Sequence, residues 1–199
     1  MSSHLATRAA NLFIAAGLVF TLSACSVNVK KNGDGEDHNV DIQTPVGGIH
    51  VSEDASAGDI GLPVYPGAKQ KEKDSGGDNK NANVNISGPG FAVRVIAIQY
   101  VSADPQQKVI DYYKDQLKKY GNVVQCQTGE HVGNVDVNQH GDDKDSNAPV
   151  TCENNDNGKT VELKVGVKSN QHVVAIEPDG TGSTFSMVYV RTHGKEGSI

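Results

Sequence analysis

The sequence predicts an α+β fold, with an antiparallel sheet of about five or six strands and one main helix packed on a face. Three observations support this class. Apolar and polar residues alternate through three segments near the C-terminus, 160–167, 172–176 and 185–190. Residues 91–101 are apolar on both faces except at two positions, as in a central strand covered by a helix on one side. Residues 105–120 have the spacing of an amphipathic helix.

The N-terminus has the pattern of an export signal. Arg8 precedes an apolar run from Ala9 to Leu22, which is short for a membrane-spanning helix. The run ends in Leu22-Ser23-Ala24-Cys25, which resembles the lipobox of bacterial lipoproteins cleaved by signal peptidase II. The resemblance implies that residues 1–24 are removed and that Cys25 becomes the diacylated first residue. An uncleaved membrane anchor is the alternative.

The same resemblance implies a location. Several acyl chains on one residue hold a protein stably on a membrane, whereas a single chain is marginal. In lipoproteins of this kind from diderm bacteria, an aspartate after the cysteine retains the protein at the inner membrane. Ser26 stands there instead. We therefore expect a lipid-anchored protein of the cell envelope, on the outer membrane facing the periplasm rather than on the inner membrane.

Two interpretations compete for residues 25–60. The alternation at 26–30 and 40–42, around a turn-forming stretch at 32–37, is compatible with a short hairpin. Pro45, two glycines and the acidic stretch 52–59 favour a solvated tether instead. We expect a lipidated N-terminus and tether over 25–60, a globular α+β domain over 61–193 and a frayed tail over 194–199.

The expected domain opens on a turn. Two prolines and Gly67 direct the chain between Leu62 and Ala68, with Val64 and Tyr65 as apolar plugs. This stretch resembles the PxYPGA opening of an uncharacterised family of bacterial envelope proteins, in which a strand and then a helix near an Asp-Pro follow. The resemblance covers roughly residues 62–120 and implies no activity. We expect a structural turn here rather than a ligand-binding loop.

After a half-exposed strand at 83–86 and the strand at 91–101, Asp104 is the expected N-cap of the helix. Pro105 suits the first helical position, and Gln107 completes a capping box. The helix should end at Gly121 and bury a stripe formed by Val109, Ile110, Tyr113 and Leu117. Tyr112, Tyr113 and Tyr120 could form a carbohydrate platform, but packing of the helix on the sheet explains most of this pattern.

The remaining segments complete the sheet. A strand at 122–126 precedes a long polar stretch at 128–149. Turns at 169–170 and 179–182 should join the three C-terminal strands into an antiparallel meander.

Three cysteines are present. If Cys25 is acylated, Cys126 and Cys152 remain as one pair in an oxidising compartment, and we expect them to form a disulfide. Closing a loop of about 27 residues would stabilise the fold by about 3 kcal/mol in the chain-entropy model. Reduced thiols are the alternative, since spacing alone does not establish the geometry.

Charge argues against nucleic acid as a partner. The chain has 18 basic and 24 acidic residues, a net charge of -6, and removal of residues 1–24 with Arg8 leaves 17 - 24 = -7. Phosphate backbones require a basic surface, and the sequence contains no basic stripe.

No strong metal or cofactor motif is present. The weak metal candidates are His131, His140, Asp142 and Asp143, in a polar loop without the spacing of a zinc or calcium site. Residues 155–158 resemble a calcium loop superficially, but a turn explains them better. We expect no cofactor.

Catalytic patterns are missing as well. No Gly-x-Ser-x-Gly occurs, and the histidines at 38, 50, 172 and 193 are scattered, as expected of surface residues. The leading hypothesis is a non-catalytic, membrane-anchored envelope lipoprotein that binds another envelope protein or polymer or has a structural role. The alternative is a small metal- or polar-ligand-binding lipoprotein using the loop at 129–149.

Overall fold

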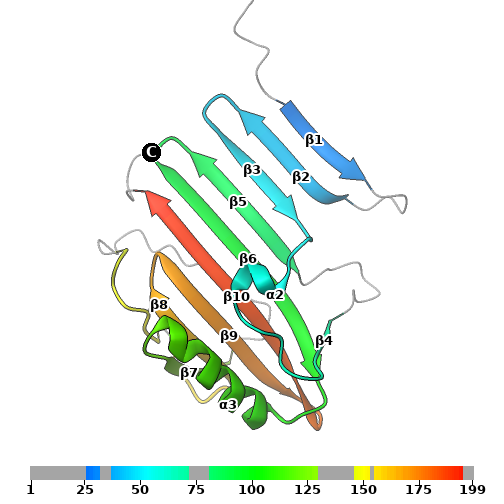
Figure 1. The fold of residues 1–199 in the computed structure, drawn as a ribbon, viewed down its shortest axis with the longest axis vertical. Coiled ribbons are helices and arrows are strands. Elements are labelled where there is room, and N and C mark those ends of the chain that lie inside the picture. Colours follow the sequence, from blue (N-terminus) through cyan, green and yellow to red (C-terminus); the bar gives the residue numbers. More distant parts are fainter. Residues whose placement is uncertain (1–25, 32–36, 72–80, 130–145, 153–154, 195–199) are drawn as a thin grey trace, which may run out of the picture.

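One antiparallel sheet runs through the whole domain (Figure 1). The computed structural model describes residues 26–31, 37–71, 81–129, 146–152 and 155–194. Its strands are β1 (Ser26–Lys31), β2 (Asp37–Thr44), β3 (Gly47–Ser52), β4 (Lys69–Gln70), β5 (Ala82–Gly88), β6 (Phe91–Ser102), β7 (Val124–Thr128), β8 (Thr160–Val167), β9 (Asn170–Asp179) and β10 (Gly182–Gly194). Its helices are α2 (Ala57–Ile60), α3 (Gln106–Leu117) and the 3-10 helix η2 (Lys118–Tyr120).

The strand order is β1-β2-β3-β5-β6-β10-β9-β8-β7, and β4 pairs with β6 beside this path. The predicted α+β class therefore holds, but the sheet has more strands than the five or six expected. The run at 91–101 is the central strand β6, as predicted. The C-terminal meander of β8, β9 and β10 is also confirmed, with antiparallel pairing throughout.

Residues 26–60 differ from the expected tether. They form β1, β2, β3 and α2, so the folded part of the chain extends back to Ser26. The physical reason lies in long-range pairing: Val51 of β3 is opposite Val40 of β2 and Val84 of β5, which joins this hairpin to the main sheet. Within the expected acidic tether, Ser56 and Asp59 form a capping box at the start of α2.

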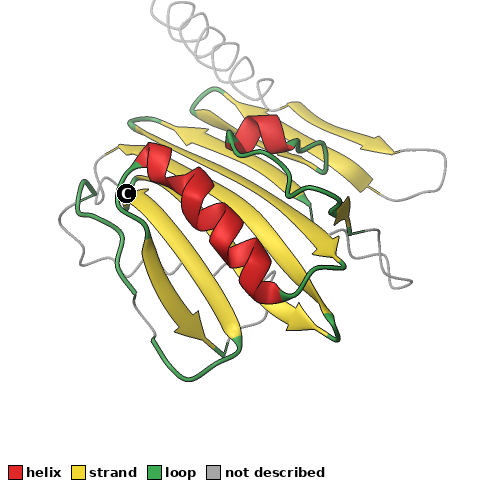
Figure 2. Ribbon diagram, turned by 60° about the horizontal axis from the view of Figure 1, so that its bottom comes forward, coloured by secondary structure: helices red, strands yellow, loops and turns green. Residues whose placement is uncertain are grey.

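Both helices cover the same face of the sheet (Figure 2). α3 lies over β8, β9 and β10, and α2 lies over β6 and β10. The four residues of the predicted helical stripe are all buried. The core between helices and sheet consists of Ile60, Leu62, Tyr65, Ile96, Ile98, Tyr100, Val109, Ile110, Tyr113, Leu117, Val161, Leu163, Val165, Val174, Ile176, Phe185 and Met187.

The start of α3 differs from the predicted capping box. Pro105 occupies the N-cap position without a side-chain cap, and the helix begins at Gln106. The carboxylate of Asp104 instead accepts hydrogen bonds from the hydroxyl of Tyr65 and the ammonium of Lys108. The predicted end holds, because the last turn tightens into η2 and the chain leaves it at Gly121, where φ is 137°.

Candidate functional site

The turn at 62–68 is held against α3 by tyrosine side chains. The hydroxyl of Tyr113 accepts from the backbone N–H of Tyr65 at 3.0 Å and donates to the carbonyl of Pro63 at 3.2 Å. The hydroxyl of Tyr120 donates to the carbonyl of Gly61 at 2.7 Å. Tyr113 is fully buried, which raises its pKa, so it cannot form an exposed platform together with Tyr120, which is 37% exposed. These contacts give the turn a role in packing.

Of the two apolar side chains in this turn that were expected to be buried, only one is. Tyr65 lies in the core, whereas Val64 is 37% exposed. Tyr65 also donates its hydroxyl proton to Asp104 at 2.9 Å, which ties the turn to the start of α3. The hydrogen bonds from Lys108 and Tyr65 lower the pKa of Asp104, and burial together with Asp104 raises the pKa of Tyr65. Tyr65, Asp104 and Lys108 therefore satisfy one another's hydrogen bonds, and the arrangement links the turn to the start of α3.

His172 is buried beneath the end of α3, contrary to the expectation of a surface histidine. Its ring stacks on Tyr120 with the centroids 3.9 Å apart and contacts Tyr189 at 4.9 Å. Burial lowers the pKa of His172. The hydrogen bond to the backbone of Ile60 raises this pKa in part, and the positive charge of Lys119 lowers it further. The ring therefore stays neutral in the folded protein near pH 7.

This burial predicts a pH dependence of stability. Below the ordinary histidine pKa of 6.5, the unfolded chain binds a proton at residue 172 before the folded chain does. The free energy of unfolding should therefore fall as the pH drops from about 6.5 toward the lowered folded pKa. Urea denaturation at pH 7.5 and pH 5.0 measures this change. His172→Phe, which keeps an aromatic ring against Tyr120, should show a smaller loss, and an equal loss in both proteins would contradict the assignment.

The predicted disulfide is present in the structure. Cys126 of β7 and Cys152 are joined with their Cα atoms 5.5 Å apart, within the usual range for a disulfide. Asn155 and Asp156, which follow Cys152, lie along the outer edge of β7. Gln127 donates its N–H to the side chain of Asn155 and accepts at its carbonyl from the N–H of Asp156. The disulfide thus pins a segment that covers an otherwise open strand edge.

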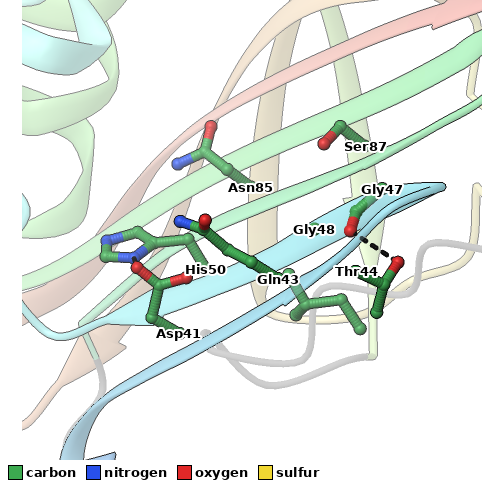
Figure 3. Close-up of a pocket in the computed structure, with 9 residues that line it drawn as sticks. Asp41, Gln43, Thr44, Gly47, Gly48, His50, Asn85 and Ser87 are labelled. Atoms are coloured by element: carbon green, nitrogen blue, oxygen red, sulfur yellow. Dashed lines mark hydrogen bonds and ion pairs between the residues drawn. The ribbon is translucent and has the colours of Figure 1, made fainter. Parts of the chain in front are cut away.

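A polar hollow lies on the helix side of the sheet, beyond the area that the helices cover (Figure 3). It has a volume of about 380 Å³ and is formed by β2, β3 and β5. Gly48 stands between Gln43 and Ser87 in the strand register, so the row lacks a side chain at its centre. The lining residues are Asp41, Gln43, Thr44, Gly47, Gly48, Ile49, His50, Asn85 and Ser87.

The polar side chains that line this hollow can donate and accept hydrogen bonds. His50 and Asp41 approach to 3.9 Å, and their side chains are 47% and 42% exposed. This pair is an ion pair only when the imidazole is protonated. Because both side chains face water, solvent competes for their hydrogen bonds.

The opposite face of the same strands is apolar. Its residues align directly across neighbouring strands, so their side chains touch in continuous rows. We call this surface the helix-free face. One row is Ile42, Ile49, Ile86 and Val93, the next is Val40, Val51, Val84, Val95 and Val190, and Ala97, Val188 and Phe91 adjoin them.

No helix or second sheet within the described ranges packs on the helix-free face, because both helices and the whole core cluster lie on the other side. Ile49 and Phe91 are 39% and 45% exposed, and the ring of Phe91 lies close to Gly88 on the paired strand. Toward β10 the face becomes less accessible, and Val190 is buried. An apolar patch of this kind is typical of an interaction site.

Sequence reasoning missed this surface. The signal was present as the alternation of Val40, Ile42, Ile49 and Val51, but it fell within the expected tether. Alternation also places apolar residues on one face without saying which face a helix covers.

Several predicted sites lie outside the described residues. They are Cys25 and the weak metal candidates His131, His140, Asp142 and Asp143. Among the residues with assigned positions, no group of three or more histidine, cysteine or acidic side chains could hold a metal ion. Within the same residues, no helix is both long and apolar enough to cross a membrane.

Comparison with known proteins adds no relative. No family model matches the chain, and neither the curated proteins nor the solved structures contain a significant match.

Proposed function

We propose that this chain is a lipid-anchored lipoprotein of a bacterial cell envelope that acts by binding a partner rather than by catalysis. The lipobox ending at Cys25 supports the anchor, with the periplasmic side of the outer membrane as the favoured location. The helix-free face carries the binding proposal, because its aligned rows of isoleucine and valine have no covering layer among the described elements.

The position of the anchor fits this function. Since β1 begins at Ser26, the folded domain follows Cys25 without an intervening tether. A lipidated Cys25 would therefore hold the sheet close to the membrane surface, where an envelope partner could reach the helix-free face. The polar hollow offers weaker support for a polar ligand, because the side chains of His50 and Asp41 are 47% and 42% exposed and water competes for their hydrogen bonds.

Photo-crosslinking in intact cells tests the binding proposal. Benzoylphenylalanine would replace Phe91 on the helix-free face or, as a control, Asp111 on the exposed side of α3. We expect an adduct of defined mass from position 91 and none from position 111. No adduct from position 91, or the same adducts from both positions, would contradict binding through this face.

A further inference from the structure

We infer that the partner of the helix-free face is a second copy of this chain, packed face to face as the two sheets of a β-sandwich. This inference rests on the proposed binding function and names its partner. A face-to-face pair related by a twofold axis buries the same surface of both copies, so the isoleucine and valine rows of one copy would pack against those of the other.

The size of the face suits a dimer. β10 is left out, because its Val188 and Val190 are already buried. The four strands β2, β3, β5 and β6, spaced about 4.8 Å apart, and the four rows from Phe91 to Ala97 along β6, about 7 Å apart, give a face of roughly 500 Å². Two copies would together bury roughly 1,000 Å², which is in the range of weak or transient protein interfaces. The area on one copy lies within the range of the largest apolar patch on a typical monomer, and such patches are often functional.

The distribution of charge favours a second copy over a lipid surface. Asp41, His50 and Arg94 project to the helix side, and the aligned rows of the helix-free face contain no charged residue. Two copies would therefore meet without repulsion between charges in these rows. The mature chain, with a net charge of -7 from 17 basic and 24 acidic residues, is not attracted to anionic lipid headgroups.

The composition of the rest of the chain also favours a second copy. The segments at 72–80 and 130–145 are mainly polar, and the three valines of the second are separated by polar residues. The apolar run from Ala9 to Leu22 is long enough to cover part of the face, but the lipobox places it before the cleavage site. Anchoring of all copies in one membrane would raise their effective concentration and compensate for a small interface.

Sedimentation velocity of the mature chain, residues 25–199 with Cys25→Ser to prevent lipidation, tests this inference. Ile49→Lys is the interface variant and Val64→Lys the matched control, since the two side chains are 39% and 37% exposed on opposite faces. We expect a dimer for the parent chain and for Val64→Lys. Ile49→Lys should raise the dimer dissociation constant by roughly 100-fold or more, because it brings two unpaired ammonium groups into the apolar interface.

Circular dichroism would establish that Ile49→Lys retains the sheet, and Ile49→Ala provides a milder variant with no added charge. A parent chain that remains monomeric over its whole soluble range would overturn the inference. So would a dimer that Ile49→Lys leaves intact, or flotation of the monomer with anionic vesicles. Crosslinking at position 91 separates the two proposals: an adduct with a different protein overturns the second copy but retains the binding function, whereas no adduct contradicts both.

Discussion

Phe185→Ala is expected to lower the free energy of unfolding by about 4 kcal/mol, because it removes a large side chain from the centre of the core. Phe185 is fully buried on β10. Its ring stacks on Tyr100 with a centroid distance of 5.4 Å and contacts Tyr113 at 5.5 Å and Tyr65 at 6.5 Å. Alanine would leave a cavity between α3, the turn at 62–68 and the sheet.

Urea denaturation followed by circular dichroism measures this effect. Phe91→Ala is the matched control, since Phe91 is 45% exposed at the edge of the helix-free face. At protein concentrations low enough to keep the chain monomeric, the control should lose about 1 kcal/mol or less. Equal losses for the two variants would show that Phe185 is not at the centre of the core.

Loss of the disulfide should have the second largest effect. Replacing Cys126 and Cys152 together with serine is expected to lower the free energy of unfolding by about 3 kcal/mol, because the unfolded chain regains the entropy of the closed loop. The bridge spans 26 positions in sequence. Small domains have a total stability of about 5–15 kcal/mol, so this loss is a substantial part of it.

Reductant provides the control for this prediction. Dithiothreitol should destabilise the parent chain by a similar amount and leave the double serine variant unchanged. Hydrogen exchange at Gln127 should also accelerate in the variant, because the segment that bonds its backbone is then less firmly held. A double variant as stable as the oxidised parent would show that the bridge does not stabilise the fold.

Local patterns predicted the C-terminal half of the domain well. β8, β9 and β10 follow one another through short turns, so alternation and turn residues were sufficient to predict their order. The buried stripe of α3 also followed from helical spacing. Asp104 was misassigned because its true partners, the hydroxyl of Tyr65 and the ammonium of Lys108, include a residue far away in the sequence.

The N-terminal half depended on contacts between distant segments. β3 ends at Ser52 and pairs with β5, which begins only at Ala82. The alternation within residues 26–60 was compatible with a hairpin, but it did not indicate the distant strand with which that hairpin pairs. Burial of His172 likewise requires Tyr120 at the end of α3. The helix-free face follows from strand register and helix placement together, and neither is encoded in a short window of sequence.

The lipid anchor at Cys25 is the feature on which the proposed function depends most. The intact mass of the protein extracted from its native membrane, with and without reduction and alkylation, tests it directly. We expect a chain that begins at Cys25 and carries acyl mass, with two thiols that react only after reduction. An unmodified chain that retains residues 1–24, with Cys126 and Cys152 free to react, would contradict both the anchor and the oxidising compartment.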